Sequence, residues 1–209
     1  MTATLATGFQ TDERLTHTAI LRAEDGTVLV APASRWFDEA EPAELRALAR
    51  VVGPVLDIGC GPGRHVAALA ERGIPALGID ITAQALSHAR ARSVPVLQRC
   101  VFAPVPGTGR WSTALLLDGN LGIGGDPVRL LRRVRELLAN DGMALVEVEP
   151  PGAGLAPCRV RFEIAGVAGP WFDWIAIDAL GLESVCTDAH LRVHECWCDD
   201  DRWFAWVGR

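Results

Sequence analysis

Several features that define whole classes of protein are missing from the sequence. It contains no tyrosine, so any mechanism that needs a phenol as its base is excluded. It has no run of about twenty apolar residues, which a membrane-spanning helix requires. Its N-terminus lacks the charged-then-apolar pattern of a secretion signal, and no internal repeat is present. We therefore expect a protein without a membrane partner.

Basic charge is scarce relative to acidic charge. Lys and Arg together number 20 against 26 Asp and Glu, which gives a net charge of −6 at pH 7. A nucleic-acid partner would require a basic face, so none is expected. The 6 cysteines are scattered without the spacing of a disulfide framework, which is typical of a reduced, cytoplasmic protein. A chain of 209 residues, 49% of them hydrophobic, indicates one domain with a full core.

The most informative stretch runs from residue 55 to residue 70. Its first four residues form a short apolar run, which predicts a buried strand. Gly59, Gly61 and Gly63 follow at alternate positions, and the last five residues have helical spacing. A glycine turn between a strand and a helix lets a ligand lie on bare backbone. The free N–H groups at the start of the helix favour an acidic group there.

The next predicted strand, at residues 75–79, ends in an acid. Asp80 lies about twenty residues beyond the glycines, where it is placed to accept hydrogen bonds from a ribose diol. The dinucleotide fingerprint G-x-G-x-x-G would require a glycine at the position of Arg64. The spacing here is instead G-x-G-x-G. Asp57 precedes the first glycine, and its carboxylate suits a cation and would repel a pyrophosphate.

The stretch Asp57-Ile58-Gly59-Cys60-Gly61-Pro62-Gly63 resembles motif I of the class I S-adenosylmethionine (SAM)-dependent methyltransferases, whose usual form is close to D-x-G-C-G-x-G. The resemblance extends well over residues 54–148. It implies an α/β, Rossmann-like fold: a mostly parallel seven-stranded sheet with helices on both faces, an antiparallel C-terminal hairpin and a small N-terminal cap. One domain would span residues 1–209, with the cap at 1–52, a SAM-binding core at 53–149, and substrate-shaping and sheet-completing elements at 150–209.

The resemblance also implies the cofactor contacts. Asp80 looks like the ribose-binding acid of the family, and Ile81 matches a position that commonly lines the adenine pocket. Family members often carry an acid after the third strand, where this chain has Cys100. A thiol is a weak acceptor, so adenine would depend on backbone groups of Val101 or Phe102. The predicted contacts are Asp57, Gly59, Cys60, Gly61, Gly63, Asp80, Ile81, Cys100, Val101, Phe102, Asp118, Gly119 and Asn120.

Two predicted strands end in polar residues that are candidates for catalysis. The apolar strand at residues 112–117 is followed by Asp118, Gly119 and Asn120. Ligands of open α/β sheets bind outside the carboxyl ends of the strands, so Asp118 and Asn120 are expected at the reaction site unless this segment is only a loop. Glu149 ends the strand at 143–149 and shares a face with Glu147. It would orient a substrate or take a proton, or else form a salt bridge.

The cap and the C-terminal third hold the remaining candidates. A hairpin at residues 20–30, turned at Asp25-Gly26, and a helix at 39–52 are predicted in the cap. Arg35 and Trp36 would contact the SAM carboxylate or the substrate. The alternative is that Trp36 only packs within the cap and Arg35 is only solvated. Two strands at 159–164 and 171–177 would bring Trp171 and Trp174 to the substrate. The alternative is that these aromatic side chains only pack the hairpin that the two strands form. His17 is a further candidate base. His65 would approach the methionine end of SAM, unless it only packs within its helix.

The last predicted elements are a helix at residues 127–139 and a closing hairpin at 190–207. The helix carries four arginines, which we interpret as a solvated face. His190, His194, Cys196 and Cys198 have the same parity on one strand of the hairpin. Residues two apart on a strand lie roughly 6.6 Å apart, which spreads four ligands too widely for one tetrahedral ion. No metal site is predicted.

The predicted reaction is methyl transfer from SAM to a small-molecule acceptor, with S-adenosylhomocysteine (SAH) as the product. The sequence does not indicate whether O, N, S or C accepts the methyl group, nor the oligomeric state. Two alternatives share the cofactor residues: a catalytically idle SAM-binding subunit or sensor, and a non-methylating use of SAM. A nicotinamide-dependent reductase would need a glycine at Arg64 and no acid at Asp57, and the sequence fails both conditions.

Overall fold

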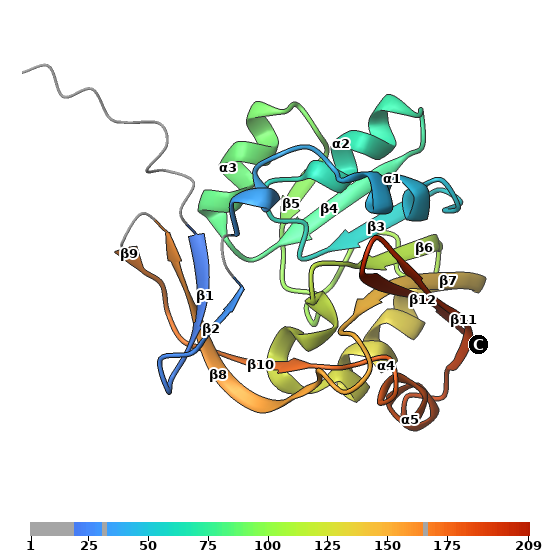
Figure 1. Ribbon diagram of the computed structural model, residues 1–209. Helices are drawn as coiled ribbons and strands as arrows, with labels where there is room; N and C mark the ends of the chain where they lie inside the picture. The colour runs from blue at the N-terminus through green and yellow to red at the C-terminus, as the bar shows by residue number, and fades with distance from the viewer. Residues whose placement is uncertain (1–18, 31–32, 165–166) are drawn as a thin grey trace, which may run out of the picture.

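The computed structural model describes residues 19–30, 33–164 and 167–209 (Figure 1). The candidate base His17 lies outside the described residues. None of the helices in the described part of the chain is long and apolar enough to cross a membrane.

The core is a seven-stranded sheet with the order β11-β12-β7-β6-β3-β4-β5. Neighbouring strands among β3 to β7 run parallel, and β12 pairs antiparallel with both β7 and β11. The predicted sheet, including its antiparallel C-terminal hairpin, is therefore confirmed. Its strands are β3 Val55–Ile58, β4 Ala76–Asp80, β5 Val96–Gln98, β6 Trp111–Leu116, β7 Leu138–Val148, β11 Arg192–Asp199 and β12 Arg202–Gly208.

Helices cover both faces of this sheet (Figure 1). Alternate side chains of a strand point to opposite faces. Leu115 accordingly packs with α1 (Pro42–Leu48) and α2 (Arg64–Glu71), whereas Leu116 packs with α4 (Pro127–Leu137) and α5 (Leu182–Asp188). The helix α3 (Ala83–Ala91) packs beside α2. Both faces of the central strands are buried, which explains why the last three residues of β6, Ala114 to Leu116, are all apolar.

A second, five-stranded sheet lies beside the main one (Figure 1). Its path is β10-β8-β1-β2, with β9 also paired to β8, and all of these pairs are antiparallel. The predicted N-terminal hairpin is present as β1 and β2, but the sequence analysis treated it as separate from the strands after residue 150. The two form one sheet. Its strands are β1 Ala19–Ala23, β2 Val28–Val30, β8 Leu155–Ile164, β9 Val167–Ala168 and β10 Phe172–Ala176.

The two sheets meet through the 3₁₀ segment η3 (Asn120–Gly125), which follows β6 and lies against β10. A Cβ added at Gly122 would lie 2.0 Å from the carbonyl oxygen of Ile175, so only glycine permits this approach of backbone to backbone. The shorter 3₁₀ segment η2 (Ala33–Trp36) leads from the second sheet to α1. Both segments border the carboxyl ends of the parallel strands, where the candidate site lies.

Several predicted boundaries differ from the structure. The helix predicted at 39–52 is only α1, which begins with Pro42 after Glu41. The Glu41 backbone N–H donates to the Glu44 carboxylate at 2.7 Å, which favours starting the helix at this point. The helix predicted at 127–139 ends at Leu137, and β7 begins directly after it, five residues before the strand predicted at 143–149. These differences move no candidate residue to another element.

Candidate functional site

The N–H groups of the glycine turn between β3 and α2 are already used within the protein. Those of Gly59 and Cys60 donate to the Ile79 carbonyl at 2.8 and 3.1 Å, and that of Gly61 donates to the Asp80 carboxylate at 3.0 Å. The N–H of Gly63 donates to the Cys60 carbonyl. Neighbouring groups therefore bind each of these four donors, and an acidic ligand would have to meet the N–H groups at the start of α2 instead.

The backbone of the turn requires its glycines. Gly59 and Gly61 have φ values of +74° and +52°, in the left-handed region. A Cβ added at Gly61 would meet nothing within 4 Å, whereas one at Gly59 would lie 2.8 Å from the Asn120 amide nitrogen. That nitrogen donates to the carbonyls of Ile58 and Gly59, each at 3.0 Å. Asn120 thus fixes the turn, and the turn's open side lies at Gly61.

Cys60 contributes only its backbone to the open side of the turn. Its side chain is buried and packs against β4, where a Cβ added at Gly78 would lie 2.6 Å from the Cys60 sulfur. Burial raises the pKa of this thiol, so it stays protonated and unreactive. The contact predicted for Cys60 can therefore involve main-chain atoms only.

Asp80 lies half-buried at the end of β4 and retains capacity to accept hydrogen bonds. One of its carboxylate oxygens accepts from the Thr82 N–H at 2.7 Å, and the other accepts from Gly61. Each carboxylate oxygen has two lone-pair sites, so each can accept a further donor such as a hydroxyl. Ile81, next in the chain, leaves 66% of its surface exposed.

The segment after β5 presents a mixed surface. Cys100 is exposed and Val101 is buried, with the Val101 carbonyl accepting from Arg133 at 2.9 Å. The guanidinium of Arg129 lies 4.3 Å from the centre of the Phe102 ring. Of the two residues on which adenine would depend, Phe102 therefore keeps an unengaged carbonyl, among the hydrogen bonds of the described residues, and Val101 does not.

Arg64, at the start of α2, organises a buried ionic cluster. Its side chain is 2% exposed and lies 2.6 Å from Glu44 of α1 and 2.6 and 2.7 Å from the two oxygens of Asp118. Asp118 has a φ of +55°, unusual for a residue with a side chain, and its N–H donates to Glu147 at 2.6 Å. Burial raises the pKa of Asp118, but the charges of Arg64 and His65 outweigh it and lower that pKa.

Arg202 joins the same cluster from β12. Its guanidinium forms a paired contact with both oxygens of Glu147, at 2.9 and 2.8 Å, and lies 2.6 Å from Glu44. It also donates to Glu41 at 2.8 Å. The sequence analysis named neither Arg202 nor Glu44 as a site residue. It noted Arg64 only because a dinucleotide-binding fingerprint would have a glycine there. These residues lie far apart in the sequence, so no periodic pattern could indicate that they meet.

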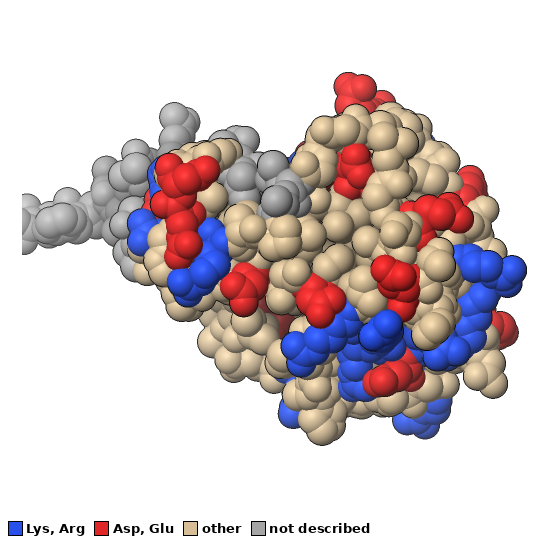
Figure 2. Space-filling model, turned by 90° about the horizontal axis from the view of Figure 1, so that it is seen from below, with Lys and Arg blue, Asp and Glu red and all other residues tan. Residues whose placement is uncertain are grey.

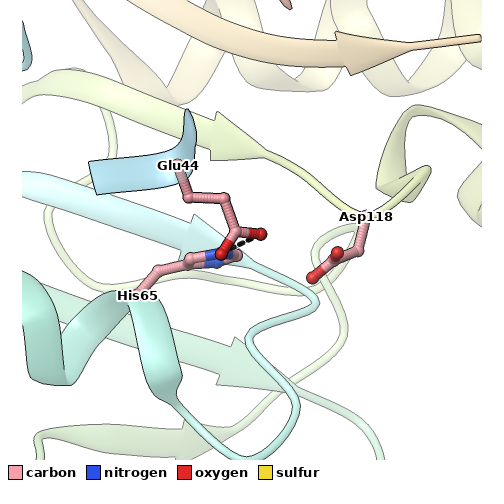
Figure 3. Close-up of side chains that lie close together, drawn as sticks. All are labelled: Glu44, His65 and Asp118. Carbon is pink, nitrogen blue, oxygen red and sulfur yellow. Dashed lines mark ion pairs between the residues drawn. The ribbon is translucent and has the colours of Figure 1, made fainter. Parts of the chain in front are cut away.

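His65, which lies beside Glu44 (Figure 3), and Asp57 complete the cluster on the side of the glycine turn. The two ring nitrogens of His65 lie 3.3 Å from Glu44 and 3.8 Å from Asp57. Burial lowers the pKa of His65, but the Glu44 carboxylate outweighs it, and the net effect raises that pKa. Asp57 has no solvent exposure, and burial raises its pKa to about 6. Neither Asp57 oxygen has a hydrogen-bond partner in the described part of the chain.

Glu44, His65 and Asp118 bring ligand atoms within 4.8 Å of one another (Figure 3). Such a group can hold a divalent cation in principle. Here the Arg64 guanidinium binds both Glu44 and Asp118, so their negative charge is already balanced by a fixed positive group. The arrangement is that of an ion-pair network. In the C-terminal hairpin, an unbroken face is not shared by His190, His194, Cys196 and Cys198, because the register shifts between Val193 and Glu195.

A cavity of about 260 Å³ lies between this cluster and the second sheet. Glu147 and Glu149, predicted to share a face, both line it. Glu149 differs from Asp118 and Glu147, because its carboxylate has no hydrogen bond or ion pair among the described residues. Burial, assisted by the charge of Glu147, raises the pKa of Glu149.

The four predicted substrate residues are not brought together. Arg35 and Trp174 line the cavity, and Trp174 lies close to the Gly119 backbone. Trp36 instead packs edge-on against Phe162, with ring centres 5.4 Å apart, and Trp171 lies under the Arg161 guanidinium at 4.8 Å. The Arg35 guanidinium makes one contact of 3.3 Å with Asp118, and its buried Nε has no partner among the described residues.

Residues 55–142, which include the glycine turn, Asp80 and Asp118, match the family described as "Methyltransferase domain". Residues 55–142 are thus similar to this family, in agreement with the resemblance predicted from the motif at Asp57–Gly63. No curated protein sequence matches the chain significantly.

Solved structures share the fold. A SAM-dependent methyltransferase from Bacteroides fragilis, in complex with SAH, is 24% identical, with a TM-score of 0.76 over 90% of this chain and 86% of that one. The 1,6-didemethyltoxoflavin-N1-methyltransferase of Burkholderia thailandensis is 22% identical, with a TM-score of 0.59 over 84% and 80%. The sugar N-methyltransferase KedS8 from a Streptoalloteichus species is 17% identical, with a TM-score of 0.57 over 79% and 84%. The chain thus has the class I methyltransferase fold.

Proposed function

We propose that this protein transfers a methyl group from SAM to a small-molecule acceptor and releases SAH. The observation that carries the proposal is the glycine turn bound to the carboxylate of Asp80, within residues that match a methyltransferase domain. Related folds bind SAM or SAH, as the Bacteroides fragilis methyltransferase does.

The residues at the turn fit SAM better than a dinucleotide. A pyrophosphate needs free N–H donors, and those of Gly59 to Gly63 are all engaged. The two acids at the turn, Asp57 and Asp80, suit a ligand that carries positive charge and hydroxyl groups. Asp57 has two buried oxygens without partners among the described residues, and such orphaned acceptors are costly unless a ligand or water satisfies them.

The proposed contacts follow from these positions. Asp80 would accept the ribose hydroxyls, and Ile81 and Phe102 would cover the adenine. Asp57 would satisfy the cationic amino group of the methionine part, and Arg35 would bind its carboxylate. When bound, SAM supplies a methyl group made electrophilic by a positively charged sulfur. Cys60, Gly119 and Asn120 would act through their backbone or by fixing the loops.

The chain's own contribution to the reaction is alignment and exclusion of water. The cavity beside Asp118 holds the acceptor. Asp118 is surrounded by Arg64, Arg35 and Arg202 and has a lowered pKa, so it positions the loop and takes no proton. Glu149 has a free carboxylate with a raised pKa and is the residue available as a base.

We further propose that residues 1–209 act as one cytoplasmic unit. All six cysteines are free, which suits a reducing compartment. Figure 2 shows acidic side chains distributed over one face, with basic side chains interspersed among them. Such a mixed face suits neither a nucleic-acid nor a membrane partner, because both favour a continuous basic surface.

The test is calorimetric titration of the protein with SAH, NAD and NADP, repeated on Asp80→Ala. We expect SAH alone to bind, and Asp80→Ala to weaken it about tenfold or more, because hydrogen bonds to a charged acceptor are lost. Asp141→Ala, which removes an exposed acid far from the turn, is the matched control and leaves the affinity unchanged. Melting temperatures verify folding.

Absence of SAH binding, or binding of NAD instead, would overturn the proposal. Binding of SAH without transfer from SAM to any acceptor would indicate the alternative role of a SAM-binding sensor.

A further inference from the structure

The acceptor cavity lies where the carboxyl ends of β6 and β7 meet the second sheet. Its lining includes Leu21 of β1, Trp174 of β10 and Trp203 of β12, opposite the acids that follow the parallel strands. Binding pockets for drug-sized molecules commonly measure about 300–1,000 Å³, so a cavity of about 260 Å³ fits a small acceptor or the reactive part of a larger one.

The cavity contains more negative charge than its arginines balance. Asp118 and Glu147 line it, but Arg64 and Arg202 bind their carboxylates. The carboxylate of Glu149 has no such partner among the described residues, although the residue stands at the end of β7 and lines the cavity. Its backbone is fixed, because its N–H donates to Ile177 at 2.9 Å and its carbonyl accepts from Ala179 at 3.0 Å.

The charged groups around Glu149 leave its charge uncompensated. Glu147 on the same strand and Asp201 in the β11–β12 turn add negative charge, and Asp178, paired with Glu149 across a β-bridge, binds the N–H groups of Gly152 and Gly181. Arg35 is the opposing cation, but it pairs with Asp118, at 3.3 Å. Glu149 is exposed at this cavity, and an unpaired carboxylate in this setting favours a cationic ligand.

Two tryptophans suit the same kind of ligand. Trp174 of β10 is 8% exposed and packs edge-on against Phe172. Trp203 of β12 also lines the cavity. Indole rings attract ammonium groups over their faces, with an energy that grows as the site is shielded from water. Leu21, Val148 and Ile177 add apolar surface for the body of a small molecule.

We propose that the methyl acceptor is a small primary or secondary amine that enters the cavity as an ammonium ion paired with Glu149. This inference rests on the proposed function. Glu149 takes one proton from the ammonium group and becomes a neutral acid, which leaves a lone pair on nitrogen. The nitrogen–carbon bond then forms as the carbon–sulfur bond of the methyl donor breaks, and that electron pair stays on sulfur.

A hydroxyl acceptor fits the cavity less well. An amine has a pKa of about 10, whereas a hydroxyl resembling water has a pKa of about 15.7, far beyond the reach of a lone carboxylate. Activating a hydroxyl would call for a histidine, a phenol or a metal. The sequence has no tyrosine, and none of the described residues that line the cavity is a histidine. His65 is buried between Glu44 and Asp57.

The experiment compares matched amines and alcohols. The panel pairs 2-phenylethylamine with 2-phenylethanol, tryptamine with tryptophol, and aliphatic amines and amino sugars with their hydroxyl counterparts. Methyl transfer from SAM is measured by mass spectrometry, and binding in the presence of SAH is measured by calorimetry. We expect transfer to members of the amine series and none to the alcohols.

Variants at Glu149 test its role. Glu149→Gln keeps the shape of the side chain and should lower kcat about a hundredfold and raise KM for the amine, with SAH affinity unchanged. In the wild type, kcat falls as the pH drops through the pKa of Glu149, and Glu149→Gln should lose this limb of the profile. Glu71→Gln, an exposed acid at the end of α2, is the matched control and should change neither parameter.

Each other outcome overturns the inference. Methylation of the alcohols would show that the acceptor class is wrong, as would SAH binding by a protein that neither binds nor methylates any amine of the panel. Amine methylation that is unchanged in Glu149→Gln would remove the residue from the reaction. Failure to bind SAH at all is a different result, because it contradicts the proposed function itself.

Discussion

At the scale of single residues, Asp57 illustrates a conflict between stability and binding. Its carboxylate has no solvent exposure and no hydrogen-bond partner among the described residues. Burial raises its pKa from 3.8 to about 6, although the neighbouring His65 opposes the shift. At neutral pH the folded protein therefore contains an ionised group that would be more stable in water. A ligand cation at the glycine turn would offset this cost, so a buried acid at this position is consistent with ligand binding there.

Replacement of Asp57 by asparagine should stabilise the protein at high pH and weaken its cofactor binding. The unfolded chain ionises Asp57 from about pH 4, and the folded protein only near pH 6, so this group's contribution to stability falls as pH rises through that window. The shift corresponds to at most about 3 kcal/mol. We expect Asp57→Asn to melt several degrees above the wild type at pH 8 and equally at pH 4, with SAH affinity reduced at least tenfold.

Thermal melts at both pH values and SAH titrations check this expectation. Asp141→Asn, an exposed acid within β7, is the control and should melt like the wild type at either pH. A lower melting temperature for Asp57→Asn at pH 8 would show that His65 compensates the charge more than burial penalises it.

At the scale of elements, Arg202 connects three parts of the fold. It reaches from β12 to Glu147 on β7 and to Glu44 and Glu41 at the start of α1, with only 11% of its side chain exposed. Buried charges that lose their partner are strongly destabilising, because the remaining ions stay out of water. The network therefore fixes α1 and the C-terminal hairpin relative to the sheet and holds the floor of the acceptor cavity.

We expect Arg202→Met to lower the free energy of unfolding by about 3–5 kcal/mol, because Glu44 and Glu147 lose a shared counter-ion. Denaturant titration at pH 7 measures this. The matched control is Arg46→Met, which breaks another link between α1 and the C-terminal hairpin, the exposed ion pairs with Asp199 and Asp200. Exposed pairs contribute little, so this variant should match the wild type. Equal losses in both variants would mean that burial of the network is unimportant.

The sequence predicted elements better than it predicted contacts between them. Apolar periodicity located the strands and α4, because a buried face leaves a repeating pattern. It did not reveal that the α4 arginines are engaged: Arg133 donates to the carbonyls of Val101 and Ala103, and Arg129 covers Phe102. The interpretation of a solvated face was therefore incomplete. An arginine on a polar face looks the same in sequence whether it reaches water or a neighbouring loop.

At the scale of the whole molecule, the two sheets have different tasks. The glycine turn and Asp80 lie at the carboxyl edge of the main sheet, and their short spacing in the chain made this site predictable. The cavity combines β7 with β1, β10 and the β11–β12 turn, whose residues lie far apart in the sequence. Leu21 and Trp174 are brought together only by the antiparallel pairing of β1 and β10 with β8. No local pattern encodes that pairing.

This division predicts that the two binding steps can be separated by substitution. Ala176 lies on β10, half-buried, and lines the cavity, so a phenylalanine there would occupy space meant for the acceptor. We expect Ala176→Phe to lower kcat/KM for the acceptor at least tenfold while SAH affinity changes less than about twofold, because overpacking acts locally. Ala168→Phe adds the same ring to an exposed position of the same sheet and should change neither value. Steady-state kinetics and calorimetry distinguish these cases. A parallel loss of SAH binding in Ala176→Phe would mean that the second sheet also shapes the cofactor site, and that the two sheets act as one binding surface.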